Sequence, residues 1–269
     1  MLGAEIYDVD LSANLDKTQI ADIRRALLDN LVIFFRDQNL TDEDLVRVGK
    51  YFGELAPLPP HRQNPGSQPE ILVVEKKPND KLNFGYEWHS DTTHLPIPPL
   101  GSILYALKVP RYGGDTMFAN QYVAYETLSD SVKDTLDGMR AIHGNGRIMR
   151  TLEDKVSPVR GQEAVSAAWS TDTSSHPIVR THPETGRKAL YVNIAHTQSI
   201  EGMEINESQP LLQMLYEHST QNHFTCRFQW EKGSVAFWDN RCCQHLALND
   251  YPGDHRLMHR VQVKGTKPI

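Results

Sequence analysis

Apolar residues recur at two different spacings in the first third of the chain. Between Asp16 and Asp29 they return every three or four positions, which predicts an amphipathic helix. The stretch Ile6–Val9 before this helix and the apolar run Leu31–Phe35 after it predict strands. Thr41 precedes acidic residues and a second helical pattern, which is typical of a helix N-terminus. The proline cluster between Pro57 and Pro69 predicts a loop.

From residue 71 onward, strand patterns dominate. The predicted strands are Ile71–Glu75, Ser102–Val109, Thr116–Ala119, Ile178–Thr181, Ala189–Asn193, Thr225–Trp230, Ser234–Trp238 and Leu257–Val263. Residues 181–186 predict a hairpin loop, and helical patterns cover 123–139 and 207–220. This pattern favours an antiparallel barrel or sandwich with helical cover, a mainly β chain of the α+β class that forms a single domain over residues 1–269. We expect the polar segment 144–175 to be a lid inserted in this domain.

The composition is that of a globular protein and argues against several function classes. The chain has 269 residues, of which 39% are hydrophobic and 23% charged, with a formal net charge of −6. This acidic balance gives no reason to expect nucleic acid or an anionic membrane as a partner. No apolar run approaches the roughly 20 residues that a membrane span needs, and no secretory signal is expected. Cys226, Cys242 and Cys243 form neither a disulfide framework nor a zinc-type spacing, so we expect a cytoplasmic protein.

The first candidate for chemistry is the sequence Trp88-His89-Ser90-Asp91. On a strand, residues i and i+2 point to the same face, so His89 and Asp91 are expected to reach one point in space. A distant histidine would complete a two-His-one-carboxylate triad, which binds Fe(II) and leaves coordination positions open. The chain holds 12 His and 19 Asp, so about one His-x-Asp pattern is expected by chance. The pattern alone therefore leaves open a structural histidine beside a solvated aspartate.

The His-x-Asp pattern does not stand alone, because several further short motifs accompany it along the chain. They are Gly3-Ala-Glu-Ile6, Asp10-Leu11, Val32-Ile-Phe-Phe35, Phe52-Gly-Glu54, Trp88-His-x-Asp91, Gly113-Gly-Asp-Thr116, Thr181-His-Pro183, Gly186-x-x-Ala-Leu-Tyr-Val-Asn193, Trp238-Asp-Asn240 and His245. In these motifs the sequence resembles the taurine dioxygenase-like family of Fe(II)- and 2-oxoglutarate-dependent dioxygenases. The resemblance covers nearly the whole chain and implies a double-stranded β-helix, the jelly-roll core of these oxygenases.

The resemblance also implies roles for individual residues. His89, Asp91 and His245 would ligate Fe(II), while Thr116 and Arg256 would hold the distal carboxylate of the cosubstrate 2-oxoglutarate. Arginine suits this task because its planar fork of donors matches a carboxylate. No catalytic residue beyond the metal site is expected. The implied reaction uses O2 to hydroxylate a small anionic organic substrate and converts 2-oxoglutarate to succinate and CO2.

Other positions bear on the prime substrate. Arg260 lies four residues after the first arginine, which returns it to the same face of a strand. The resemblance pairs this second arginine with an anionic group of the substrate. Taurine-type members carry a His and an Asn where this chain has Leu58 and Gly85, which predicts a more apolar pocket. Tyr86 and Trp238 are further candidates for substrate contacts.

The stretch 200–218 looks most like the aryloxyalkanoate members of the family, so an aryloxyalkanoate-like carboxylate is the favoured substrate. A taurine, alkyl sulfonate or sulfate ester dioxygenase is the alternative. Two remoter alternatives are a non-catalytic metal-binding jelly roll and a zinc hydrolase. Glu87 would be the base of such a hydrolase, although the chain has no His-Glu-x-x-His motif. The oligomeric state stays open, and a homo-oligomer is allowed.

Overall fold

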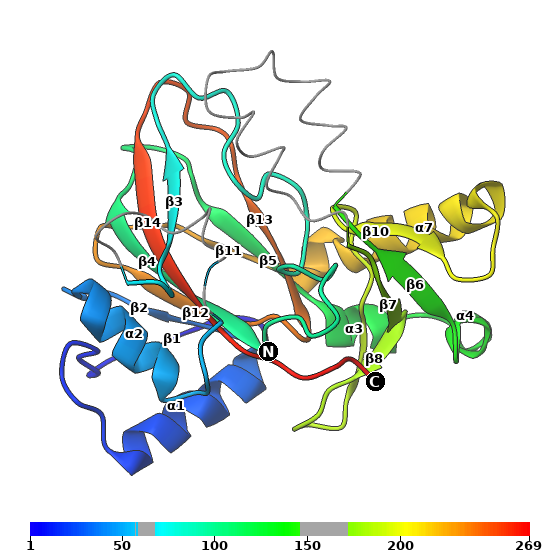
Figure 1. Cartoon of the computed structure of the whole chain (residues 1–269), viewed down its shortest axis with the longest axis horizontal. Coiled ribbons are helices and arrows are strands. Elements are labelled where there is room, and N and C mark those ends of the chain that lie inside the picture. Colours follow the sequence, from blue (N-terminus) through cyan, green and yellow to red (C-terminus); the bar gives the residue numbers. More distant parts are fainter. Residues whose placement is uncertain (57, 59–67, 146–171) are drawn as a thin grey trace.

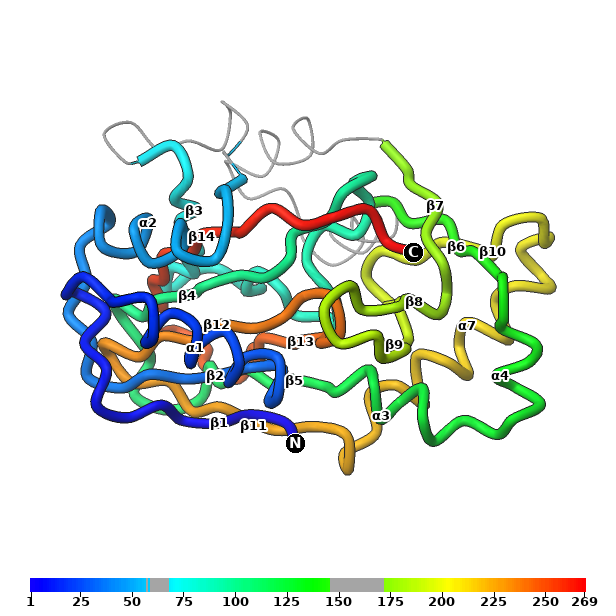
Figure 2. Tube along the Cα trace, turned by 90° about the horizontal axis from the view of Figure 1, so that it is seen from below, coloured from blue at the N-terminus to red at the C-terminus, as the bar shows by residue number. Residues whose placement is uncertain are grey.

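The largest element of the fold is a six-stranded sheet in the order β1-β2-β12-β4-β14-β3. A computed structural model describes residues 1–56, 58, 68–145 and 172–269. The strands of this sheet are β1 (Ala4–Glu5), β2 (Val32–Phe35), β3 (Leu72–Lys76), β4 (Gly101–Lys108), β12 (Val235–Asp239) and β14 (Arg256–Val263). β1 runs parallel to β2, and the other pairs are antiparallel. Figure 2 shows β2, β12 and β4 running side by side.

A second, three-stranded sheet packs against the first. It contains β11 (Thr225–Phe228), β5 (Thr116–Asn120) and β13 (Cys243–Ala247), with β5 in the centre. Aromatic side chains join the two sheets: the Phe34 ring stacks on Phe228 at a centroid distance of 4.0 Å and meets the edge of Phe118 at 5.7 Å. Two mainly antiparallel sheets that enclose one apolar core form the expected jelly roll.

Alternate residues of the large sheet point to opposite faces. In β2, Val32 and Phe34 join the core between the sheets, whereas Ile33 and Phe35 join the core beneath the N-terminal helices. Both faces are buried, which explains the continuous apolar run in this part of the sequence. The covering helices are α1 (Lys17–Asn30) and α2 (Asp42–Lys50), on one side of the molecule in Figure 1.

The other side of the molecule carries a second helical layer (Figure 1). It contains α3 (Gln121–Glu126), α4 (Asp130–Leu136), α7 (Ile205–Ser219) and the short 3-10 helix η2 (Asn222–Phe224). A sheet of β10 (Thr197–Ile200), β6 (Arg140–His143) and β7 (Ser174–Pro177) packs with them. The hairpin of β8 (Val179–Thr181) and β9 (Lys188–Leu190) turns through the loop predicted at 181–186.

Several boundaries differ from the sequence predictions. The helix expected over 123–139 is two short helices, because the chain turns at 127–129 before α4. The first strand pairs at Ala4–Glu5 rather than at Ile6–Val9, and Asp8 adopts a φ of 60°. Strands β6, β7, β10 and β13 were not predicted. The expected lid at 144–175 lies mostly outside the described residues, and its last two residues belong to β7.

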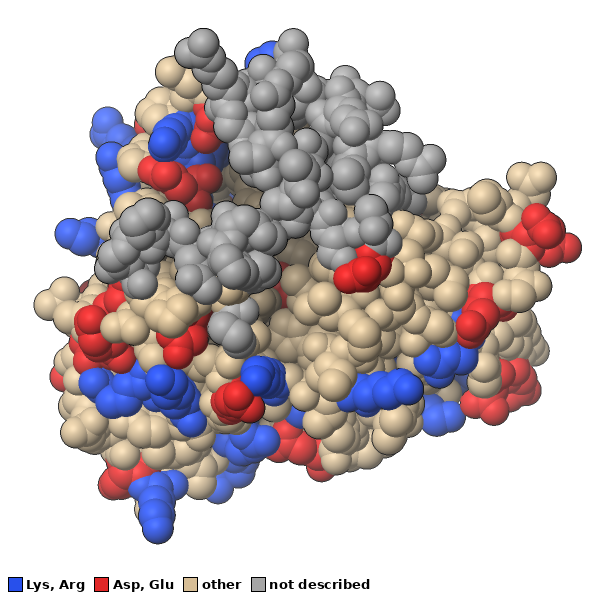
Figure 3. All heavy atoms as spheres, viewed as in Figure 1, with Lys and Arg blue, Asp and Glu red and all other residues tan. Residues whose placement is uncertain are grey.

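The surface and the helices carry two further observations. None of the described helices is long and apolar enough to cross a membrane. On the face shown in Figure 3, acidic and basic side chains of the described residues are interspersed.

Candidate metal centre and active site

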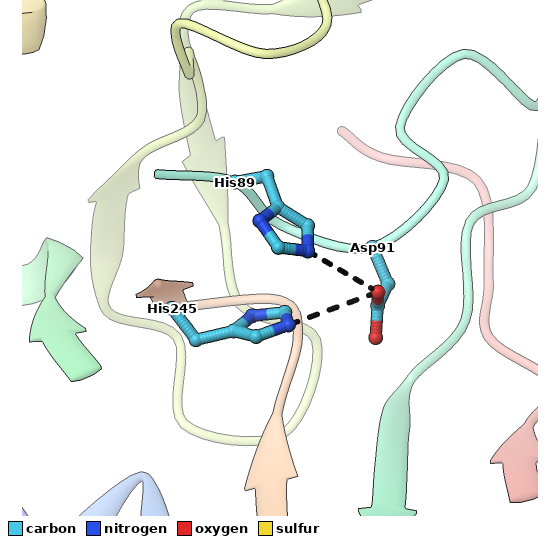
Figure 4. Close-up of side chains that lie close together, drawn as sticks. All are labelled: His89, Asp91 and His245. Atoms are coloured by element: carbon cyan, nitrogen blue, oxygen red, sulfur yellow. Dashed lines mark ion pairs between the residues drawn. The ribbon is translucent and has the colours of Figure 1, made fainter. Parts of the chain in front are cut away.

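Three side chains that can ligate a metal converge inside the jelly roll (Figure 4). The Nε2 atoms of His89 and His245 lie 3.7 and 3.8 Å from Oδ1 of Asp91. All three residues are buried, and their ligand atoms lie within 4.8 Å of one another. Metal bonds of about 2.1 Å at right angles place donor atoms about 3 Å apart. A small contraction of this set would therefore bring three ligands onto one face of an ion.

Backbone pairing brings the two histidines together. His245 lies in β13, and His89 forms an isolated bridge with it, in which each residue donates its N–H to the carbonyl oxygen of the other. Asp91 does not share a strand with His89, so that part of the sequence prediction was wrong. It begins a turn in which Thr92 has a φ of 48°. The turn, rather than strand alternation, brings the carboxylate to the imidazoles.

Both histidines offer neutral rings. Burial lowers the pKa of His89, and burial together with the neighbouring His89 ring lowers the pKa of His245 well below 6.5. The Nδ1 atom of His89 lies 2.7 Å from the carbonyl oxygen of Glu87. Because a carbonyl can only accept, Nδ1 carries the proton and Nε2 presents its lone pair. This is the tautomer that a metal requires of His89.

Asp91 is held as a carboxylate. Burial alone would raise its pKa, but the Arg260 guanidinium and the hydrogen bond from Ser102 outweigh burial and keep the pKa well below its ordinary value. Arg260 Nη1 donates to Oδ1 at 2.8 Å, and the Ser102 hydroxyl donates to Oδ2 at 2.6 Å. The carboxylate is thus ionised and fixed at both oxygens.

A buried cation lies in the same pocket as the two histidines. Arg256 is 3% exposed, and its Nε and Nη2 have no hydrogen-bond partner among the described residues. A buried guanidinium without an acceptor is costly, so this position fits an anionic ligand. Thr116 lines the same pocket, and Trp230 Nε1 donates to its Oγ1 at 2.9 Å. Because indole N–H is only a donor, the Thr116 hydroxyl can donate its own hydrogen to a ligand. The residues therefore fit a metal with a carboxylate cosubstrate beside it.

Three other predicted residues also line this pocket. Arg260 lies on the same face of β14 as Arg256, as their spacing predicted. Gly85 has a φ of 84°, and a Cβ built on it would lie 3.0 Å from Cε1 of His89. The Trp238 ring packs against the ring of His245 at a centroid distance of 4.6 Å. Gly85 and Trp238 thus form walls of the candidate metal centre.

The structure does not bring Tyr86 and Leu58 into the lining of this pocket. The hydroxyl of Tyr86 has no hydrogen-bond partner among the described residues, and burial raises its pKa to about 12. Leu58 is half-buried, and its N–H donates to the carbonyl oxygen of Pro69. Their contacts with a substrate stay predictions.

Two polar side chains that support the site, Ser102 and Trp230, were not predicted from the sequence. Ser102 is fully buried at the start of β4. A serine in an otherwise apolar strand was the available signal for it. Trp230 has no comparable signal, because its role as a donor to Thr116 depends on tertiary contact.

A second group of potential metal ligands is instead an ion-pair cluster. It comprises His182, Asp239 and Cys242. Both oxygens of Asp239 already accept hydrogen bonds from Arg241, at 2.8 and 2.6 Å, and His182 Nε2 lies 3.1 Å from Oδ2. Burial raises the pKa of Cys242 well above its ordinary value, so the thiol is protonated. These contacts tie the β8–β9 hairpin to β12.

A jelly roll that encloses two histidines and one aspartate beside a buried cation defines the class of non-haem metal oxygenases. The chain belongs to the taurine catabolism dioxygenase TauD, TfdA family, whose family model matches residues 1–262. It is therefore a 2-oxoglutarate-dependent dioxygenase, and the cofactors of this class are Fe(II), 2-oxoglutarate and O2.

Two curated relatives illustrate the range of this family. The chain is 34% identical over 271 residues to an alpha-ketoglutarate-dependent sulfate ester dioxygenase from Pseudomonas putida, covering 100% of this chain and 88% of the relative. It is 31% identical over 272 residues to the (S)-phenoxypropionate/alpha-ketoglutarate-dioxygenase of Sphingobium herbicidovorans, covering 98% and 92%. Enzymes of this family thus act on small organic substrates.

Solved structures agree with this assignment. A taurine dioxygenase from Burkholderia xenovorans matches with a TM-score of 0.81 and 38% identity, covering 100% of this chain and 88% of that one. The structure of AAD-2 in complex with Mn(II) and N-oxalylglycine matches with a TM-score of 0.82 and 28% identity, covering 99% and 95%.

Proposed function

We propose that His89, Asp91 and His245 bind Fe(II), and that Thr116 and Arg256 hold the distal carboxylate of 2-oxoglutarate. The observation that carries this proposal is the convergence of the three ligand atoms next to a pocket that also contains Arg256, a buried guanidinium whose Nε and Nη2 have no hydrogen-bond partner among the described residues. When bound, iron and 2-oxoglutarate together activate O2 for hydroxylation of a substrate C–H bond, with release of succinate and CO2.

The chain's own contribution is orientation and charge. Arg256 supplies two N–H groups toward the cosubstrate carboxylate, and Thr116 supplies an O–H whose direction is set by the hydrogen bond from Trp230. Burial excludes water from these contacts, which strengthens them. Because the pair holds the far end of 2-oxoglutarate, its keto acid end is directed at the metal ligands.

Arg260 is the group we assign to the anionic part of the prime substrate. One of its nitrogens donates to Asp91, while its Nε has no hydrogen-bond partner among the described residues. The wall around it includes Val74, Phe84, Leu104 and Ala247. A small anion with an apolar body fits one cation set in an apolar wall.

The first candidate substrate is a sulfate ester of a small alcohol. Relatives at 34% identity are a sulfate ester dioxygenase and an alkylsulfatase. An aryloxyalkanoate is the second candidate, supported by relatives at 31% and 30% identity that act on phenoxypropionate and 2,4-dichlorophenoxyacetate. Both kinds of molecule carry a C–H bond on a carbon attached to oxygen. Hydroxylation of that carbon gives an unstable product that releases sulfate or a phenol.

Succinate release from a panel of anions tests this proposal. The panel contains a short alkyl sulfate, the matching alkyl sulfonate, phenoxyacetate, phenoxypropionate and taurine. We expect the highest kcat/KM with the alkyl sulfate and release of sulfate equal to succinate. Higher activity with the phenoxy acids would move the assignment to the second candidate. Taurine as the best substrate would contradict both.

The same assay separates the remoter alternatives. A non-catalytic metal-binding protein would release no succinate with any substrate. A zinc hydrolase would release sulfate without consuming 2-oxoglutarate.

A further inference from the structure

The side chain of Asn240 forms hydrogen bonds with both backbone groups, the N–H and the C=O, of the proposed metal ligand Asp91. Its Oδ1 accepts from the Asp91 N–H at 2.6 Å, and its Nδ2 donates to the Asp91 carbonyl oxygen at 3.0 Å. Nδ2 also donates to the carbonyl oxygen of Pro99 at 3.2 Å. Asn240 has no exposed surface, and its own N–H donates to the carbonyl oxygen of Leu100. The amide thus uses both its acceptor and its donors.

This contact replaces the strand pairing that Asp91 lacks. His89 is held by its bridge with β13, but Asp91 lies two residues further on, in a turn. The next residue, Thr92, has a positive φ, which is unfavourable for a β-branched residue. A strand neighbour would satisfy the N–H and C=O of Asp91, and the amide of Asn240 does so instead.

The side chain of Asp91 is fixed separately. Ser102, fully buried at the start of β4, donates to Oδ2 at 2.6 Å. This leaves Oδ1 as the oxygen that faces the two imidazoles, at 3.7 and 3.8 Å. Asn240 therefore fixes the backbone of Asp91, while Ser102 and Arg260, which donates to Oδ1 at 2.8 Å, fix the rotation of its carboxylate.

We propose that Asn240 is a positioning residue for the metal: it holds the Asp91 backbone so that Oδ1 lies in reach of both imidazole Nε2 atoms. The inference rests on the proposed metal site. It assigns a role to the third residue of the Trp238-Asp-Asn240 motif that does not require Asn240 to touch metal, cosubstrate or substrate. Outer groups that orient a metal ligand change metal affinity by about 10- to 100-fold when removed.

The test compares Asn240→Ala with a matched variant, Asn120→Ala, in the full chain. Asn120 is also a buried asparagine at the end of a strand, and its Oδ1 accepts from the N–H groups of Tyr122 and Val123 at 3.0 and 3.1 Å. Both variants lose buried backbone contacts, but only Asn240 contacts the metal ligand. The measurements are the Kd of the metal-free protein for Mn(II) and the melting temperature without metal.

We expect Asn240→Ala to raise the Kd for Mn(II) at least tenfold, whereas Asn120→Ala changes it less than twofold at a similar loss of melting temperature. An equal effect of the two variants on the Kd, or none of Asn240→Ala, would overturn the proposal. If Asn240→Ala does not fold, Asn240→Asp decides. Asn240→Asp keeps the oxygen that accepts from the Asp91 N–H but replaces the Nδ2 donor with an oxygen that faces the carbonyl oxygens of Asp91 and Pro99. We therefore expect this variant to weaken Mn(II) binding as well. An unchanged Kd for Mn(II) would overturn the proposal.

The visible absorption spectrum provides a second test, because a residue with only a structural role would not change the charge-transfer band. Under anaerobic conditions with saturating Fe(II) and 2-oxoglutarate, we expect Asn240→Ala to shift or weaken the visible charge-transfer band, and Asn120→Ala to leave it unchanged. Failure of the underlying metal site is distinguishable, because then the unmodified chain would bind no Mn(II) and Asp91→Ala would change nothing.

Discussion

His89 and His245 exchange both backbone hydrogen bonds, at N···O distances of 3.0 and 2.8 Å, although they lie far apart in the sequence. This bridge, together with the hydrogen bond from Ala247 N–H to the Gly85 carbonyl oxygen, joins the segment before the Asp91 turn to β13 of the three-stranded sheet. The imidazole rings consequently lie with their centroids 4.0 Å apart. Closure of the jelly roll therefore brings the distant His245 to the two candidate ligands of the His-x-Asp motif.

Replacing Gly85 tests how closely the backbone approaches this pair. We expect Gly85→Ala to reduce metal affinity and activity, because its Cβ would lie 3.0 Å from Cε1 of His89 and the residue has a φ of 84°. Titration of the metal-free protein with Mn(II) measures the effect. Gly253→Ala is the control, since Gly253 also has a positive φ but no atom within 4 Å of the added Cβ. Equal losses in both variants would attribute the effect to backbone strain.

The two pocket arginines are predicted to serve different ligands. Arg256→Gln should raise the KM for 2-oxoglutarate roughly 10- to 100-fold, because a charge-assisted contact with the cosubstrate is lost. Arg260→Gln should mainly raise the KM for the prime substrate, with some loss of metal affinity through its contact with Asp91. Steady-state kinetics with each substrate varied in turn measures both effects. The opposite pattern would show that the two roles are exchanged.

Trp230 is predicted to act on 2-oxoglutarate through Thr116. Trp230→Phe keeps an aromatic ring but removes the N–H that donates to Thr116 Oγ1. The Thr116 hydroxyl then loses its preferred direction, and we expect the KM for 2-oxoglutarate to rise about 2- to 10-fold with little change for the prime substrate. Isothermal titration with 2-oxoglutarate in the presence of Mn(II) gives the same comparison without turnover. Unchanged binding would exclude this role.

The buried pair of Asp239 and Arg241 is predicted to stabilise the fold. Asp239→Asn should lower the free energy of unfolding by about 3 kcal/mol at pH 7, since it leaves the Arg241 charge without its main partner. Urea unfolding followed by circular dichroism measures this difference.

The same pair gives a pH dependence with a defined sign. Burial opposes ionisation of Asp239, but Arg241 and His182 outweigh burial and hold its pKa below the ordinary value of 3.8. The stabilisation is therefore fully present above about pH 4 and is lost as the pH falls through the lower pKa of the folded state. The difference between the unmodified chain and Asp239→Asn should shrink only below about pH 4. A difference that shrinks between pH 7 and pH 5 would contradict this assignment.

Much of the fold could be predicted from the sequence because its strands are rich in apolar residues. The run that forms β2 and the residues of β12 are buried on both faces of the large sheet. The missed strands are short and mixed in character: β10 reads Thr-Gln-Ser-Ile and β13 reads Cys-Gln-His-Leu-Ala. Their extended structure depends on pairing with β6 and β5, which local spacing cannot indicate.

The candidate ligands could be predicted because the resemblance supplied a distant histidine for the His-x-Asp pattern. The physical reason first given for that pattern, a shared strand face, was wrong, since Asp91 lies in a turn. The supporting contacts of Ser102, Trp230 and Asn240 join residues far apart in the chain. Such contacts follow from tertiary packing, and only Ser102, a polar residue in a mainly apolar strand, leaves a local signal.

The most direct test of the metal site is the anaerobic absorption spectrum with Fe(II) and 2-oxoglutarate. If the ligand set and the Arg256 pocket act together, the unmodified chain develops a weak visible charge-transfer band at one equivalent of Fe(II), and Asp91→Ala and His245→Ala do not. A band of equal intensity in those variants, or no band in the unmodified chain, would contradict the account.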